Sequence, residues 1–141
     1  MGPAADGFFG FSVALSSTTA VIGAPLAPVR LAGPTFTSGR EPHGGYRRPA
    51  RRRGNDFGWS VAISGTRVLI GAPRESLNLC GTSCEYIRIG HTWVERAEIL
   101  NPGCAIGDDF GNAVALSGRT AIIGAPGADK GNGAVYLNAV P

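Results

Sequence analysis

The chain has 141 residues but only one lysine, one methionine and two histidines, and it has no long hydrophobic run. No stretch approaches the roughly 20 apolar residues that a membrane-spanning helix needs, so we expect no such helix. Residues 1–6 have neither the basic region nor the apolar core of a secretion signal, so a signal for export would have to lie outside this sequence. The two histidines leave few side chains that can act as a general base near neutral pH.

Motifs of nucleophilic and acid–base catalysis are also missing. Ser12 and Ser60 each follow a Phe-Gly pair, but neither lies in a Gly-x-Ser-x-Gly elbow. No pair of acidic residues has a spacing that singles it out for acid–base work. We therefore expect that the chain is not an enzyme. An Arg-Gly-Asp sequence is absent as well, and Arg53-Gly54-Asn55 comes nearest to it.

Cysteine is scarce and odd in number: the three are Cys80, Cys84 and Cys104. None of them has a histidine at metal-ligand spacing, which argues against a zinc site. Cys80 and Cys84 enclose three residues, so a local disulfide between them is possible in an oxidising compartment. Three unpaired small hydrophobic residues fit the sequence equally well.

The net charge of +3 comes from one short stretch. Five arginines lie within seven residues: Arg47, Arg48, Arg51, Arg52 and Arg53. Without these five charges the net charge is −2, so the rest of the chain is slightly acidic. Clustered guanidinium groups pair well with phosphates and acidic glycans, which makes an anion-binding module one alternative function. A solvated loop without function is the other interpretation, and the absence of a surrounding nucleic-acid module argues against nucleic acid as a partner.

One phrase occurs three times: a Phe-Gly pair, a β-rich run and Gly-Ala-Pro. In each copy the first glycine and the Gly-Ala-Pro glycine lie 13 residues apart, and successive copies are offset by 48 and 53 residues. Such a period is typical of repeat architectures such as propellers. We expect packing roles for the repeated residues, because the phenylalanines are bulky anchors and the prolines end strands. The repeated positions are Phe9, Gly10, Gly23 and Pro25, then Phe57, Gly58, Gly71 and Pro73, and finally Phe110, Gly111, Gly124 and Pro126.

The alternating runs predict an all-β chain. Residues 59–71, 84–98 and 112–124 each read as an antiparallel hairpin, and one repeat holds about four strands, the content of one propeller blade. The first copy has Ser16-Ser17-Thr18 where the others have a Ser-Gly turn, so we expect its hairpin to be slightly looser. The side chains that we expect to be packed between blades are Val61, Ile63, Leu69, Val114, Leu116 and Ile122.

The chain divides into four parts. Residues 1–25 form a first hairpin, 54–103 a full repeat, and 104–141 a truncated repeat. Residues 26–53 break the pattern with prolines and glycines and read as a degenerate basic loop, which we expect to be the least ordered part. Their length is close to that of a hairpin, so one hypothesis is a hairpin sequence replaced or scrambled by a compensated frame shift.

These motifs resemble FG-GAP repeats, the blades of the β-propeller of integrin α-subunits and of many bacterial surface proteins. The bacterial variety is the most similar, on the basis of Asp108-Asp109-Phe110-Gly111, Ile123-Gly124-Ala125-Pro126 and Trp93. The resemblance covers 6–25 and 55–138. It implies two to three blades of an incomplete or open propeller. It also implies a non-catalytic binding or adhesion module of a surface or secreted protein, with a protein or glycan as ligand.

Calcium sites of that family use alternating aspartates after Gly-Ala-Pro, since a hard cation needs several converging oxygens. In the third repeat the corresponding loop offers only Asp129 and Asn132, with Lys130 between them. The acidic motif is absent, so we expect no cofactor, and these two residues are weak candidates for a metal site. Asp108 and Asp109 are expected to cap backbone amides of the turn before Phe110.

A propeller closes with about four blades or more, and this chain supplies fewer than three complete ones. We therefore expect uncovered apolar faces on the terminal blades, with further propeller repeats or self-association as the way to cover them.

Overall fold

The computed structural model describes residues 8–17, 19–25, 30–32, 56–75, 79–90 and 92–141. The arginine cluster and most of the degenerate segment 26–53 lie outside these residues.

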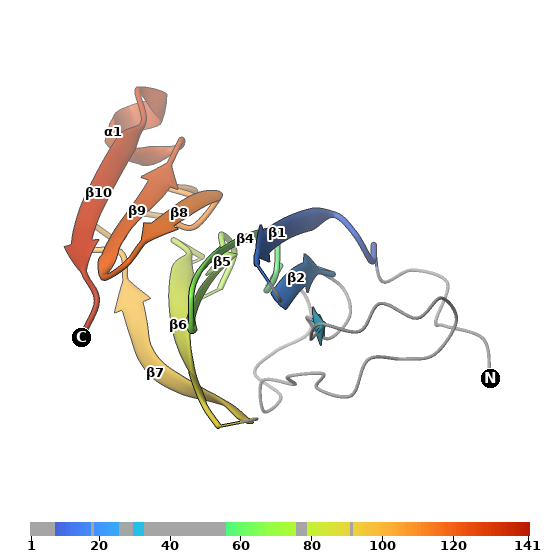
Figure 1. Ribbon diagram of the computed structural model, residues 1–141. Helices are drawn as coiled ribbons and strands as arrows, with labels where there is room; N and C mark the ends of the chain where they lie inside the picture. Colours follow the sequence, from blue (N-terminus) through green and yellow to red (C-terminus); the bar gives the residue numbers. More distant parts are fainter. Residues whose placement is uncertain (1–7, 18, 26–29, 33–55, 76–78, 91) are drawn as a thin grey trace.

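The described chain is built from three antiparallel sheets, each with its strands in chain order (Figure 1). We number these sheets blades 1, 2 and 3. Blade 1 consists of β1 (Ser12–Ser16), β2 (Thr19–Gly23) and β3 (Arg30–Ala32). Blade 2 consists of β4 (Ser60–Ser64), β5 (Arg67–Ala72), β6 (Thr82–Ile89) and β7 (Thr92–Leu100). Blade 3 consists of β8 (Ala113–Ser117), β9 (Thr120–Ala125) and β10 (Ala134–Ala139), with the short helix α1 (Ala128–Gly131) before β10.

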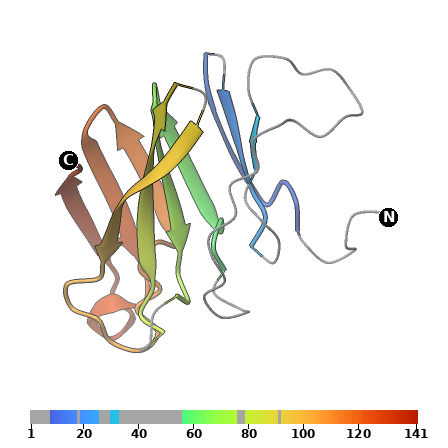
Figure 2. The same ribbon diagram turned by 90° about the horizontal axis from the view of Figure 1, so that it is seen from below.

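The three sheets lie side by side in chain order, with blade 2 between the other two (Figures 1 and 2). This arrangement is that of open propeller blades, and it confirms the all-β prediction. The three predicted hairpins are confirmed as β4–β5, β6–β7 and β8–β9. Within the described residues, no helix is long and apolar enough to cross a bilayer.

The first hairpin differs from the prediction. β1 and β2 are joined by two residues, since Ser16 pairs with Thr19 just as Ser117 pairs with Thr120 in blade 3. Gly118 follows Ser117 in the turn of blade 3 and has φ 55°. Ser17 follows Ser16 at the equivalent position of blade 1 and has φ 30°. The expectation of a looser first hairpin was wrong, because serine accepts the left-handed backbone in place of glycine.

Replacing Ser17 with glycine should stabilise the chain by about 1 kcal/mol, because a residue with a Cβ pays roughly this much for a positive φ. The midpoint of urea unfolding measures the gain. The reverse change in the equivalent turn, Gly118→Ser, should cost a similar amount. An unchanged midpoint for both variants would contradict the account.

One short strand lies where we predicted only a loop. Arg30–Ala32 form β3, which pairs with Ala20–Ile22 of β2. The start of the degenerate segment therefore still supplies the third strand of a blade. The prediction that 26–53 is the least ordered part concerns residues that are mostly outside those described.

Two apolar cores lie between the blades. In β4 and β5, the side chains of Val61, Val68 and Ile70 face blade 1, where they meet Val21. On the opposite side of the same two strands, Leu69 faces blade 3. The predicted burial between blades is confirmed for Val61 and Leu69, and it is partial for the three side chains Ile63, Val114 and Leu116.

Ile122 is a correction. It occupies the position of Leu69 in its own repeat, and we expected it to be packed, yet it is 43% exposed. Its neighbour Ile123 is fully buried instead. The reason is the alternation along β9: Ile123 faces blade 2, whereas Ile122 faces the side of blade 3 on which the described chain places no further sheet.

The cysteines are a second correction, because Cys80 forms a disulfide with Cys104. Cys84 takes no part in this bond and is buried in the core between blades 1 and 2. Both earlier interpretations, a Cys80–Cys84 bond and three unpaired thiols, were wrong. Cys84 lies in the extended strand β6, and extended backbone carries it beyond the about 7 Å between Cα atoms that a disulfide tolerates.

Candidate interaction site

The Phe-Gly pair forms the same turn in all three repeats. Gly10, Gly58 and Gly111 adopt φ values of 88°, 92° and 92°. Each donates its backbone N–H to the carbonyl of the Gly-Ala-Pro glycine of its own repeat, at 3.1, 3.1 and 3.0 Å. Glycine is needed here because a side chain strongly disfavours this backbone conformation.

The same turn joins neighbouring blades. Ser12 Oγ donates to the Gly58 carbonyl at 2.9 Å, and Ser60 Oγ donates to the Gly111 carbonyl at 2.7 Å. A Cβ on Gly71 would overlap the Gly111 carbonyl oxygen, and one on Gly23 would overlap that of Gly58. The Gly-Ala-Pro glycine therefore provides the space in which the next Phe-Gly turn sits against the blade.

Blade 2 receives the turn of blade 3 in a socket that we define by Trp59, Ser60, Gly71, Ala72, Pro73, Cys80, Gly81, Thr82 and Ser83. Phe110 donates its N–H to the Cys80 carbonyl at 3.0 Å and forms a parallel bridge with Gly81. The closest atoms to a Cβ built on Gly111 belong to Thr82, Ser83 and Ala72.

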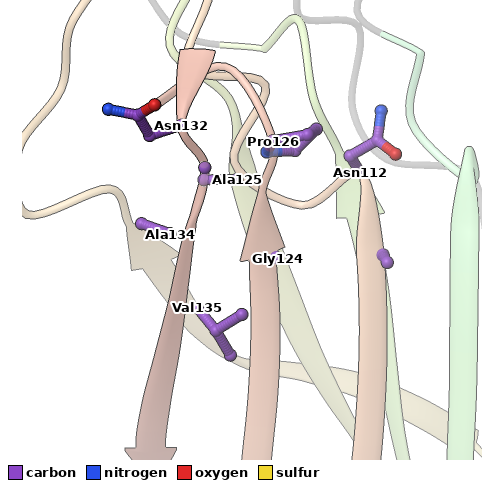
Figure 3. Close-up of a pocket in the computed structure, with 9 residues that line it drawn as sticks. Asn112, Gly124, Ala125, Pro126, Asn132, Ala134 and Val135 are labelled. Atoms are coloured by element: carbon purple, nitrogen blue, oxygen red, sulfur yellow. The ribbon is translucent and has the colours of Figure 1, made fainter. Parts of the chain in front are cut away.

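Blade 3 has an open hollow of about 500 Å³ at the corresponding place (Figure 3). The hollow is lined by Asn112, Ala113, Gly124, Ala125, Pro126, Asn132, Gly133, Ala134 and Val135. Among the described residues other than its chain neighbours, the nearest atom to a Cβ built on Gly124 is 3.6 Å away, in contrast to Gly71. The described chain therefore leaves this seat for a Phe-Gly turn open.

The repeated aromatic anchors differ in burial. Phe57 contacts Tyr86 with ring centroids 6.3 Å apart, and Phe110 contacts Tyr136 at 5.2 Å, each within its own blade. Phe9 is 65% exposed.

The repeated prolines follow strand ends, as expected: Pro73 comes after β5 and Pro126 after β9, and Pro25 stands two residues beyond the end of β2.

The loop that contains Asp129 and Asn132 has an internal hydrogen bond. Asn132 Nδ2 donates to Asp129 Oδ2 at 3.2 Å, so the amide nitrogen, not its oxygen, faces the carboxylate. Asp129 and Lys130 both adopt positive φ, at 49° and 57°. Among the described residues, no group of three or more His, Cys, Asp or Glu side chains is placed to hold a metal ion. Weak or absent metal binding remains a prediction.

The loop between β7 and β8 lies at the same end of the molecule as α1 (Figure 2). Asp108 accepts hydrogen bonds from Asn101 Nδ2 at 2.7 Å and from the Ala105 N–H at 2.9 Å. The capping role predicted for Asp108 is confirmed, whereas the part of Asn101 was missed. The Cys80–Cys104 disulfide fixes this loop to the start of β6.

Two large apolar side chains are exposed near the disulfide, one on the loop between β7 and β8 and the other on the segment before β6. Ile106 is 81% exposed and Leu79 is 55% exposed, and the Gly107 N–H donates to the Leu79 carbonyl at 3.3 Å. Leu79 adopts φ 52°, a conformation that bulky residues rarely occupy. The sequence held no signal for this feature, because neither residue belongs to the repeated phrase.

A buried carboxylate between blades 2 and 3 was also missed. Glu85 is fully buried and pairs with Arg67, which also donates to the Pro141 carbonyl at 2.7 Å. The hydrogen bond from Arg67 ties the C-terminal residue to blade 2. The ion pair has the character of a structural contact, since the Glu85 carboxylate is closed off from solvent.

The predicted anion-binding residues Arg47, Arg48, Arg51, Arg52 and Arg53 lie outside the described residues.

The comparisons with known proteins gave one family. The sequence model described as FG-GAP repeat matches residues 2–30, 52–82 and 93–138, which is more than half of the chain. No curated protein matched the chain.

Proposed function

Because the chain belongs to the FG-GAP repeat family, we propose that it is a non-catalytic binding or adhesion module of a secreted or cell-surface protein and that it binds a protein ligand. The observation that carries this proposal is Leu79, an exposed leucine held at a left-handed φ of 52° beside a disulfide. Backbone strain of this kind costs about 1–3 kcal/mol and clusters at functional sites.

The surroundings of Leu79 fit a binding role. Ile106 adds a second exposed apolar side chain, and the disulfide and Asp108 hold both backbones in place before any ligand arrives. A preorganised surface binds more tightly because less conformational entropy is lost on association. The disulfide supports an extracellular location, since disulfides form and persist in oxidising compartments.

Binding is tested with the immobilised chain and a panel of purified extracellular-matrix proteins and sulfated glycans. We expect saturable binding to at least one protein, and an affinity at least about tenfold lower for Ile106→Asp, because the substitution places a charge in the contact. The matched control is Ile89→Asp, another exposed isoleucine, at the β6–β7 turn, which should bind normally.

Leu79→Gly separates function from folding. Glycine relieves the positive φ, so this variant should be about 1 kcal/mol more stable and yet bind more weakly. A variant that is more stable and binds equally well would contradict a binding role for Leu79.

The arginine cluster offers the competing function. Retention on heparin that disappears when the five clustered arginines are neutralised, together with normal binding by Ile106→Asp, would favour an anion-binding module on a structural scaffold.

A further inference from the structure

In the described part of the chain, the outward faces of the two terminal blades carry exposed apolar side chains. Val13 and Leu15 of β1 are 69% and 75% exposed on the side of blade 1 that faces away from blade 2. On blade 3 the corresponding outward side chains are Ile122, Val135 and Leu137. The equivalent faces of blade 2 are both covered, by blade 1 and by blade 3.

The open face of blade 3 is equivalent to the face of blade 2 that packs against blade 3. The register places Gly124 opposite Val135 and Ala125 opposite Ala134, just as Gly71 lies opposite Ser83 and Ala72 opposite Thr82. Gly133 before β10 has φ 86°, the same value as Gly81 before β6. By this correspondence, each of the nine residues that line the hollow of blade 3 matches one residue of the socket in blade 2 that holds Phe110 and Gly111.

The matching insert is present at the other end of the chain. Phe9 and Gly10 form the same turn as Phe110 and Gly111, with the same hydrogen bond to their Gly-Ala-Pro glycine. Among the described residues, none outside the chain neighbours of Gly10 has an atom within 4 Å of a Cβ built on Gly10, whereas a Cβ on Gly111 touches blade 2. Within the described part of the chain, the turn is therefore preformed and has no partner blade.

We propose that the hollow of blade 3 receives the Phe9-Gly10 turn of a second copy of this chain, so that the outward face of blade 3 packs against the outward face of blade 1. Such a head-to-tail contact closes into a ring when the rotation per blade allows it. Propellers have about four to eight blades, and two copies of the three described blades lie within this range. The match between the hollow and the Phe9-Gly10 turn is the argument for a second copy in a closed dimer, and this inference does not depend on the ligand proposed above.

We expect the contact between two copies to be weaker than the contacts between neighbouring blades within one chain, because one residue differs. Ser12 and Ser60 each donate a hydroxyl to the carbonyl of the following Phe-Gly turn, but the third repeat has Ala113 at this position. A hydrogen bond of this kind contributes on the order of 1 kcal/mol. Ala113→Ser should therefore tighten the dimer by about fivefold at each joint.

Sedimentation of the full 141-residue chain over a range of concentrations tests the proposal. We expect a monomer–dimer equilibrium that Gly124→Ala weakens by at least about 100-fold, because the new Cβ occupies the space of the incoming carbonyl at both joints. The matched control is Gly103→Ala, a glycine with similarly open surroundings outside the hollow, and it should dimerise normally. A chain that stays monomeric, or a dimer that Gly124→Ala leaves unchanged, overturns the proposal.

A second pair of variants tests the head-to-tail geometry. Leu15→Lys on blade 1 and Leu137→Lys on blade 3 should each abolish the dimer, because each places a charge in the same joint. Ile89→Lys, on the hairpin of β6 and β7, should have no effect. A dimer that only one of the two leucine variants disrupts would join like faces and would overturn the proposal.

Discussion

Replacing Cys80 with serine should lower the free energy of unfolding by about 3 kcal/mol, because the disulfide closes a loop between residues 24 positions apart and removes entropy from the unfolded chain. Loss of the disulfide should also weaken the contact between blades 2 and 3, since the Cys80 carbonyl accepts a hydrogen bond from the Phe110 N–H. Urea unfolding without a reducing agent measures the loss.

Reduction provides the control for this variant. Dithiothreitol should destabilise the unmodified chain by the same amount and leave Cys80→Ser unaffected. Cys84→Ala should keep its response to dithiothreitol, because Cys84 lies in the core and outside the disulfide. The denatured chain should show one reactive thiol before reduction and three afterwards. Three thiols before reduction would contradict the Cys80–Cys104 bond.

The repeat period explains how much of the fold was predictable. Three copies with the same internal spacing allow strands and turns to be placed in register, and the observed hairpins follow that placement. Burial was harder, because alternation tells which side chains share a face but not whether a neighbour covers it. Leu69 and Ile122 are equivalent in sequence, yet blade 3 covers Leu69 while Ile122 is 43% exposed.

Features outside the repeated phrase were not predictable from one sequence. The disulfide joins the start of β6 to the loop between β7 and β8, and a sequence separation of 24 residues gives no sign that they meet. The positive φ of Leu79 is imposed by its surroundings, since leucine itself disfavours this conformation. The role of the repeated glycines was predictable only as packing. Their use as seats for the next turn became clear from the contacts of Gly23 and Gly71.

Gly71→Ala should lower the free energy of unfolding by about 2 to 4 kcal/mol. The added Cβ overlaps the Gly111 carbonyl oxygen, so blades 2 and 3 must move apart, which costs about 1–3 kcal/mol in a packed core. The same displacement breaks the hydrogen bond from Ser60 Oγ to that carbonyl, worth about 1 kcal/mol. The backbone of Gly71 does not have a positive φ, so the loss comes from the contact and not from strain. Urea unfolding measures it.

Gly124→Ala is the matched control, because it introduces the same methyl group at the same position of the next repeat. Its nearest neighbour is 3.6 Å away, an ordinary contact, so its stability should stay within about 0.5 kcal/mol of the parent chain. Both variants are compared at a concentration at which the parent chain is monomeric, since association would add its own stabilisation. Equal losses of unfolding free energy in the two variants would mean that the glycine is needed within its own strand and not for the contact between blades.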